Sequence, residues 1–428
     1  MPTPYYPLTP GVLIDPTNES TQLAPFDNFF AGVFEFNGAL WAVLFNAISS
    51  TVQVATSTDN GATWAILDKG DAPTANDGTW VQDGSTIIVG IQAAAPGTVS
   101  FVTFDMIGQA WGVSGIATSP SLDHLNGSVL RNDGSLVLIG NNGGGVGDSG
   151  FDVYIWDGTS WSASIDMAAE LNAQPWYGGN FGIQNPTYTT DGNTIWFGCS
   201  AEDNSNDQVA FAVSLAADNS VGPLWLFPDG DLTTQPANIF PGVQNVNGWP
   251  TLVGSTVILP LYVAGPVDYP TLSASFDGGN TYTMLGTPGV DPPAFNSSPS
   301  SFAMCHYAPQ ATSDGTSLYL IYGLLDNSGN ASTLRLCVTT PTGNDPATWT
   351  WACSDAQDIS SMGAGYNQWE SPFLLFQSGV PVLLLAATAS FDFGAETPMV
   401  LLSSFTRGRV HGTFVGFVLE GQFSGGTK

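Results

Sequence analysis

Apolar residues along this chain gather in short runs, and each run follows a polar turn that contains glycine. The run over residues 39–44, after Asn37 and Gly38, is nearly continuous in apolar residues and no longer than a strand. Such runs are expected of strands that are covered on both faces. Hairpin turns of this kind recur at the spacing of a repeated unit. The seven turn glycines are Gly38, Gly84, Gly134, Gly192, Gly254, Gly315 and Gly379.

A second series of residues stays in phase with the glycines. In each unit an aromatic residue opens the predicted last strand, and the series is Trp64, Trp111, Trp161, Trp225, Tyr282, Trp349 and Phe414. The two series together predict four strands per unit, A to D, with the glycine in the A–B turn and the aromatic residue after the C–D turn. In the first unit we expect strands over about residues 30–36, 40–46, 52–57 and 63–67.

These units predict a single all-β propeller, because radial repetition of four-stranded sheets leaves few sheet edges exposed. We expect seven blades over residues 29–420, with six or eight as alternatives if an irregular unit is misread. Residues 1–28 are proline-rich and predict an N-terminal extension. It is either a strand near residues 11–15 that helps to close the ring or an arm that docks on a neighbour. Residues 421–428 are predicted to be a flexible tail.

Two octapeptides share one turn pattern. Residues 57–64, STDNGATW, match Ser-x-Asp-x-Gly-x-Thr-Trp, and residues 275–282, SFDGGNTY, repeat it with Tyr for Trp. Such a turn needs a side-chain acceptor, a positive φ and an aromatic anchor. Here the chain resembles the Asp-box (BNR-repeat, sialidase-like) β-propeller superfamily, which includes sialidases, other glycosidases and many non-enzymatic propellers. The resemblance implies a structural role for Ser57, Asp59, Gly61, Trp64, Ser275, Asp277, Gly279 and Tyr282.

Charge narrows the range of partners. The chain holds 6 Lys and Arg against 36 Asp and Glu, a formal net charge of −30 at pH 7. Phosphate backbones and anionic lipids repel such a surface, so we expect no nucleic-acid partner and no membrane insertion. The first residues, MPTPYYP, lack the basic and apolar regions of a Sec signal peptide. We expect an extracellular protein or a virion component that reaches its place without that signal, although a cytosolic protein would look the same.

The four cysteines, Cys199, Cys305, Cys337 and Cys353, have no metal-binding spacing. Buried free thiols are the first interpretation. The alternative is a disulfide between Cys337 and Cys353 across neighbouring strands of one blade.

The predicted binding face is the one where the D–A and B–C connections meet, since the Asp boxes lie in turns on the opposite face. The starts of the A strands there carry aromatic residues beside carboxylates and amides, a combination that suits sugars. Packing in the inner layer of the ring explains the same residues equally well. The candidate ligand-binding residues are Trp80, Trp176, Tyr177, Trp249, His306, Tyr307 and Trp369.

The sequence contains no recognisable catalytic set. Sialidases hold their substrate with an arginine triad, and this chain has only four arginines, of which Arg131 lies beside an A–B turn. A general glycoside hydrolase needs two carboxylates across the scissile bond. If the protein is an enzyme, its catalytic candidates are Glu370, Asp77, Asp123 and Tyr366.

Two predicted B–C loops, residues 147–152 and 202–207, are rich in the oxygen ligands that calcium prefers. Neither matches a known calcium loop, so solvated turns are the first interpretation and calcium binding is the alternative. The possible calcium ligands are Asp148, Asp152, Glu202, Asp203 and Asp207. No firm metal site and no other cofactor is predicted.

Together these patterns predict a non-enzymatic propeller, extracellular or part of a phage virion, that binds a glycan or receptor or docks to other structural proteins. A homo-oligomer or a virion assembly is compatible with that role. The alternative is an Asp-box glycoside hydrolase with a sialidase-like fold but no recognisable arginine triad.

Overall fold

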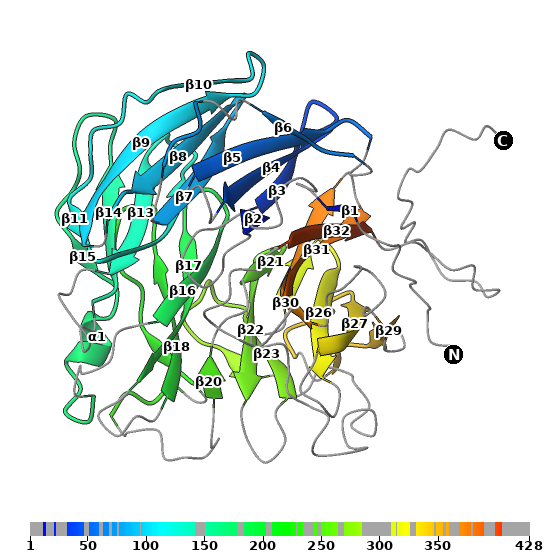
Figure 1. Cartoon of the computed structure of the whole chain (residues 1–428). Helices are drawn as coiled ribbons and strands as arrows, with labels where there is room; N and C mark the ends of the chain where they lie inside the picture. Colours follow the sequence, from blue (N-terminus) through cyan, green and yellow to red (C-terminus); the bar gives the residue numbers. More distant parts are fainter. Residues whose placement is uncertain are drawn as a thin grey trace.

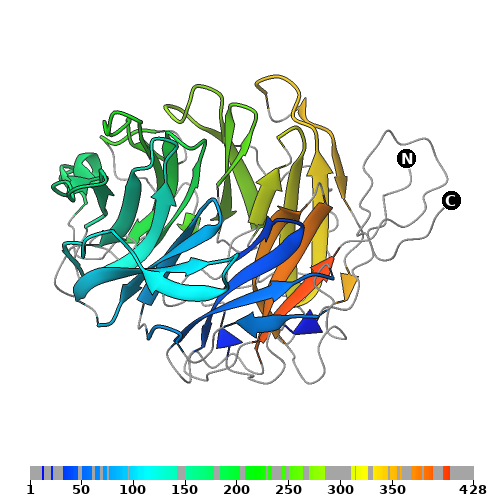
Figure 2. The same ribbon diagram turned by 90° about the horizontal axis from the view of Figure 1, so that it is seen from above.

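The computed structural model has the predicted all-β architecture. The described strands form seven antiparallel sheets, which Figure 1 shows arranged in a ring around a central axis. Seen from above in Figure 2, the blue first blade lies beside the orange last one. The described residues are 12–13, 21–22, 32–46, 51–59, 63–67, 71–74, 77–94, 96–141, 150–177, 184–202, 208–227, 230–233, 243–245, 250–263, 269–284, 310–313, 315–325, 331–345, 348–353, 357–358, 368–377, 380–388 and 399–404.

The first three blades take the strands in chain order. Blade one contains β2 (Thr21–Gln22), β3 (Gly32–Phe36), β4 (Ala39–Asn46), β5 (Thr51–Ser57) and β6 (Ala65–Leu67). Blade two contains β7 (Asp77–Asp83), β8 (Thr86–Gln92), β9 (Gly97–Asp105), β10 (Ala110–Val113) and β11 (Ser121–Leu122). Blade three contains β12 (His124–Leu130), β13 (Leu136–Asn141), β14 (Asp152–Trp156) and β15 (Ile165–Asp166). The four strands predicted for the first unit are therefore present as β3 to β6.

The next three blades follow the same plan, after the short helix α1 (Ala169–Asn172). Blade four contains β16 (Gln184–Thr190), β17 (Ile195–Glu202), β18 (Gln208–Leu215) and β19 (Trp225–Leu226). Blade five contains β20 (Val243–Asn245), β21 (Thr251–Val253), β22 (Thr256–Val263), β23 (Tyr269–Ser275) and β24 (Thr283–Met284). Blade six contains β25 (Gln310–Ser313), β26 (Leu318–Leu325), β27 (Ala331–Thr339), β28 (Trp351–Cys353) and β29 (Gln357–Asp358).

The seventh blade joins the two ends of the described chain. It contains β30 (Gln368–Gln377), β31 (Val380–Thr388), β32 (Met399–Ser404) and β1 (Val12–Leu13). Val12 pairs with Leu402 and Leu13 with Leu401, so β1 takes the place of the outermost strand. The last member of the aromatic series, Phe414, lies outside the described residues.

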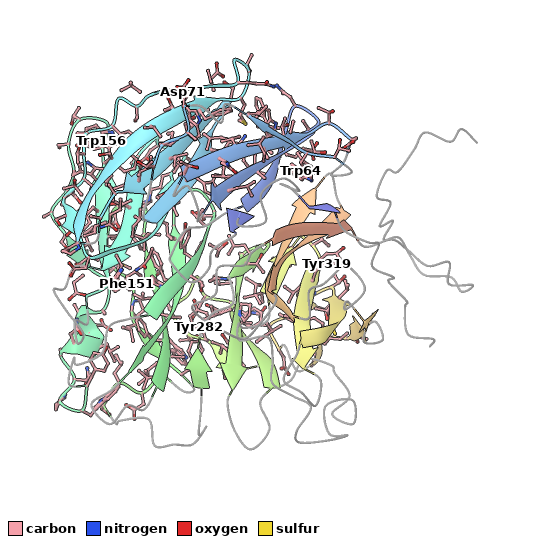
Figure 3. The ribbon with its side chains drawn as sticks, in the orientation of Figure 1. Trp64, Asp71, Phe151, Trp156, Tyr282 and Tyr319 are labelled. Atoms are coloured by element: carbon pink, nitrogen blue, oxygen red, sulfur yellow. The ribbon has the colours of Figure 1, made fainter. Side chains whose placement is uncertain are left out.

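The core lies between the blades. Phe151 of blade three and Phe197 of blade four meet edge to face, with ring centroids 5.2 Å apart, in a cluster that joins these two blades. Similar clusters of buried apolar side chains join blades one and two, two and three, four and five, and five and six. Figure 3 shows Trp156 and Tyr282 in two of these layers. Burial on both faces of a blade explains why the B strands are nearly continuous in apolar residues.

Glycine turns set the register of the hairpins. Asn37 and Gly38 both have positive φ, at 52° and 73°, as a two-residue turn between antiparallel strands requires. Among the described helices, none is long and apolar enough to cross a membrane.

Candidate functional site

Strand direction divides the ring into two faces. The strands of each blade alternate in direction, so the A–B and C–D turns lie at one end, which we name the turn face. The D–A and B–C connections lie at the other end, which we name the connection face. The backbone N–H of Val52, at the start of β5, donates to the carbonyl of Pro73, 2.9 Å away, in the connection that leads to blade two.

The aspartates of both octapeptides accept equivalent sets of hydrogen bonds on the turn face. Asp59 accepts hydrogen bonds from the hydroxyl of Ser57, at 2.8 Å, and from the backbone and hydroxyl of Thr63, at 2.8 and 2.6 Å. Asp277 accepts equivalent bonds from Ser275 and Thr281, at 2.9, 2.9 and 2.7 Å. Hydrogen bonds from Thr63 hold the pKa of Asp59 below its ordinary value. The carboxylates of Asp59 and Asp277 therefore make these hydrogen bonds within their own turns.

The second turn also packs against the neighbouring blade. Gly279 has a φ of 94°, and a Cβ there would lie 2.6 Å from the Trp196 ring. The indole N–H of Trp196 donates to the carbonyl of Gly278 at 2.8 Å, and Tyr282 is buried beside Phe227. Trp64 of the first turn is half-buried, and Figure 3 marks its position in blade one. Gly61 lies outside the described residues.

The innermost strands are irregular near the connection face. Register shifts interrupt β12 at Asn126, β16 at residues 185–186, β20 at Gln244 and β30 at residues 371–372. Each shift gives the innermost strand one residue more than its partner, close to the strand's start. β-Bulges of this kind re-aim side chains and are common next to binding sites. Four of the seven blades therefore have their inner ends reshaped at the same level of the ring.

The described candidate aromatic residues pack within the protein. Trp80 stacks on Phe34 of blade one, with ring centroids 5.2 Å apart. Trp176 donates its indole N–H to the carbonyl of Leu232 at 2.9 Å, and Tyr177 is buried in the cluster between blades three and four. Packing inside the protein, the alternative to sugar binding, therefore explains the described contacts of Trp80, Trp176 and Tyr177. Trp249, His306 and Tyr307 lie outside the described residues, and Trp369 is placed only as a residue of β30.

A buried polar chain joins the inner strands of blades two, three and four. The hydroxyl oxygens of Thr79 and Ser128 lie 2.8 Å apart. The Tyr188 hydroxyl donates to the Ser128 carbonyl at 3.1 Å and accepts from its N–H at 3.2 Å. Burial raises the pKa of Tyr188 well above its ordinary value. A Cβ at Gly127 would come within 2.5 Å of the Tyr188 ring, so this close approach requires glycine.

The catalytic candidates come from three blades. Asp77 is the first residue of β7, Asp123 directly precedes β12, and Glu370 lies in β30 beside its register shift. The backbone thus places all three at the connection-face ends of inner strands. Tyr366 lies outside the described residues.

Gln92 is a positioning residue that the sequence did not single out. Its side chain has 0% exposure, and its amide N–H groups donate to the carbonyls of Gly97, at 3.0 Å, and Leu122, at 2.7 Å. Leu122 directly precedes Asp123, so Gln92 holds the segment that leads into blade three against blade two. The signal in the sequence is a polar residue that ends the apolar run of β8.

The calcium candidates occupy different environments. Asp152 was predicted in a loop, but it is the first residue of β14, is 7% exposed and accepts a hydrogen bond from the Ser164 hydroxyl. Burial raises its pKa, and the facing Asp166 adds to the effect. Glu202 is the last residue of β17, whereas Asp148, Asp203 and Asp207 lie outside the described residues. Within the described part of the chain, no three metal-ligating side chains gather in one place.

Arg131 has a structural role. It follows β12 on the turn face, is 4% exposed, and donates to Asn219 Oδ1 and the Ala216 carbonyl at 2.6 and 2.9 Å.

The cysteines differ in their bonding. Cys337 lies directly opposite Cys353 in the register and is disulfide-bonded, which overturns the free-thiol interpretation for this residue. Cys199 is a buried free thiol, as expected.

Solved structures share this architecture at low sequence identity. Polysaccharide lyase Uly1 is 11% identical with a TM-score of 0.53, and the match covers 94% of this chain and 97% of the lyase. The fold is that of a β-propeller. An ulvan lyase of a family designated PL25 is 8% identical with a TM-score of 0.50, covering 94% of each chain. That lyase has also been solved bound to a repeat of glucuronate and sulfated rhamnose. No protein-family model and no curated protein matches the sequence of this β-propeller.

Proposed function

We propose that this protein is a non-enzymatic propeller, extracellular or carried on a phage particle, whose connection face binds a glycan or receptor or docks other structural proteins. The observation that carries the proposal is the set of register shifts in β12, β16, β20 and β30. They reshape the inner end of four blades on one face, next to Asp123 and the backbone positions of Asp77 and Glu370. Polar groups gathered at one end of a rigid ring suit the recognition of sugar hydroxyls.

The disulfide supports a place outside the cytosol. Disulfides persist in oxidising surroundings and are rare where thiols are kept reduced. Cys337 of β27 is disulfide-bonded, opposite Cys353 of β28. A protein displayed on a cell surface or a virus particle meets such surroundings.

The alternative function is a glycoside hydrolase of the Asp-box group. The observation that favours it is that the backbone positions of three candidate residues, Asp77, Asp123 and Glu370, lie at inner strand ends on one face. A hydrolase needs one carboxyl group as an acid and another as a base or nucleophile.

The test is retention of the purified full-length protein on immobilised neutral and acidic polysaccharides, with released reducing ends and unsaturated sugar ends measured in the same samples. We expect retention without release. Asp123→Asn, at the connection-face end of β12, should weaken retention, whereas the matched Asp133→Asn beyond the other end of that strand should not. Release that Glu370→Gln abolishes would replace this proposal with the hydrolase. Absence of retention would remove the glycan-binding part and leave docking to proteins.

A further inference from the structure

Residues 122–128, where the chain enters blade three, are held at both ends by side chains of other blades, and we name them the entry segment. At its start, the Gln92 amide of blade two donates to the Leu122 carbonyl at 2.7 Å. At its end, the Tyr188 hydroxyl of blade four donates to the Ser128 carbonyl at 3.1 Å and accepts from the Ser128 N–H at 3.2 Å. The register shift of β12 lies between these two points. Blades two and four therefore determine where this part of blade three runs.

Two glycines let neighbouring groups come close to the entry segment. A Cβ at Gly140 of β13 would lie 2.7 Å from the His124 carbonyl oxygen, and a Cβ at Gly127 would lie 2.5 Å from the Tyr188 hydroxyl. A larger residue at either position would push the backbone away from its neighbour. These contacts and the hydrogen bonds at both ends act on the main chain of the segment, so they fix its path.

The entry segment presents two polar side chains at the connection face. Asp123 is half-buried and His124 is exposed, whereas Asn126 is 1% exposed. A carboxylate accepts hydrogen bonds from sugar hydroxyls, and an imidazole offers both a donor and an acceptor. Side chains on a backbone that is already fixed lose less freedom when a ligand binds, so their hydrogen bonds contribute more to affinity.

We infer that Tyr188 and Gln92 are positioning residues of the connection-face site, an inference that rests on the proposed function. Neither residue has to touch the ligand. Gln92 holds the residue before Asp123, and Tyr188 holds β12 beyond its register shift. Together they keep Asp123 and His124 in one arrangement, which sugar hydroxyls meet. Loss of either hold lets the entry segment move and weakens binding of a glycan that contacts these two side chains.

The first comparison removes one hydroxyl from each of two positions in β16. Tyr188→Phe removes the hydroxyl that bonds the entry segment. Thr190→Val is the matched control at the turn-face end of the same strand. The Thr190 hydroxyl also serves one carbonyl and one N–H, those of Thr194 and Gly192, at 2.8 and 2.9 Å. The full-length proteins are compared for retention on immobilised dextran, galactomannan and polygalacturonate, for thermal unfolding and for amide hydrogen exchange.

Tyr188→Phe should reduce retention roughly fivefold, the size of one lost hydrogen bond between neutral groups, and should speed amide exchange within residues 122–128. Thr190→Val should lower the thermal midpoint by a similar amount but leave retention unchanged. Gln92→Met, which removes the amide donors at nearly constant side-chain length, should act like Tyr188→Phe. Equal losses of retention in Tyr188→Phe and Thr190→Val would assign the loss to stability and overturn the inference.

A double-mutant comparison tests whether Tyr188 acts through Asp123. Asp123→Asn should weaken retention less in the Tyr188→Phe background than in the wild-type protein, because the carboxylate is no longer held in place there. Additive losses would overturn the positioning role. If none of the three polymers retains the wild-type protein, the proposed function itself fails, whereas faster exchange without loss of retention in Tyr188→Phe overturns only this inference.

Discussion

At the scale of single residues, burial decides chemistry that the sequence leaves open. Asp152 and Asp277 are both aspartates near strand ends, yet their surroundings move their pKa values in opposite directions. Burial raises the pKa of Asp152. Burial also opposes ionisation of Asp277, but hydrogen bonds from Thr281, Ser275 and Asn280 outweigh it and hold that pKa below its ordinary value. At neutral pH the ionised Asp152 therefore destabilises the folded state, whereas the ionised Asp277 stabilises it.

The first prediction concerns Asp152→Asn. A group whose folded pKa is raised stabilises the fold below its unfolded pKa and loses that contribution as pH rises through the folded pKa. Removing the charge should therefore raise the thermal midpoint at pH 7 by roughly 1–3 °C. The gain should vanish near pH 3, where wild-type Asp152 is protonated as well. Thermal unfolding across this pH range, with and without calcium, measures it. A lower midpoint that depends on added calcium would instead support the calcium interpretation of Asp152.

At the scale of elements, the turns and the edges of the blades hold the repeat together. The Asp277 carboxylate is the acceptor that organises the C–D turn of blade five, and Gly279 brings this turn against Trp196 of blade four. In blade six, Cys337 of β27 is disulfide-bonded and lies opposite Cys353 of the neighbouring strand β28. Both features act locally within one blade or between two.

The second prediction concerns Asp277→Ala, which removes an acceptor of several hydrogen bonds. We expect a loss of about 1–3 kcal/mol in unfolding free energy at pH 7. Because the pKa of Asp277 is lowered in the fold, its contribution is present above the unfolded pKa and is lost as pH falls through the folded pKa. The difference between variant and wild type should shrink in acid. Asp83→Ala, in an exposed turn of blade two, is the matched control and should cost little.

The third prediction concerns the disulfide. A bond between Cys337 and Cys353 closes a short loop, and chain entropy assigns such a loop about 3 kcal/mol of stabilisation. Cys337→Ser, or a reducing agent on the wild-type protein, should lower the free energy of unfolding by a similar amount and lower the thermal midpoint with it. A reducing agent added to the Cys337→Ser variant should then change nothing further. Thiol titration before and after reduction checks the bond directly, and unchanged thiol counts would contradict it.

At the scale of the whole molecule, stability depends on closing the ring. Every described core cluster joins two blades, so a blade that lacks a neighbour leaves apolar surface exposed. Strand β1 closes the seventh blade from the other end of the chain by pairing with β32. This pairing links residues that are almost as far apart in sequence as the chain allows.

The fourth prediction concerns deletion of residues 1–14, which removes β1. The lost strand pairing should lower the unfolding free energy by at least about 2 kcal/mol. Limited proteolysis should then cut first near blade seven. Deletion of residues 421–428, the predicted flexible tail, is the control and should leave the thermal midpoint unchanged. Equal midpoints for wild type and the N-terminal deletion would show that the ring does not rely on β1.

The sequence by itself determined the repeat and the four-stranded plan of each unit, but not the fifth short strand that blades one, two, five and six contain. Hydrophobic runs after Gly38 and its six counterparts, with an aromatic residue in phase, follow from local turn geometry and from burial on both faces of a strand. Because these rules act over a few neighbouring residues, they produce a recognisable sequence pattern in every unit. They also predicted the turn chemistry of Asp59 and Asp277, because these side chains bond to residues only a few positions away.

Only the tertiary structure decided which polar and aromatic residues are available for function. Trp80 and Tyr177 are of the residue types that bind sugars. Their packing partners, however, lie on other strands and, for Trp80, in another blade. The register shifts at Asn126 and Gln244 arise from pairing with neighbouring strands and leave no local pattern. The physical reason is that burial and strand register depend on residues distant in the chain, whereas turns and hydrophobic periodicity depend on neighbours.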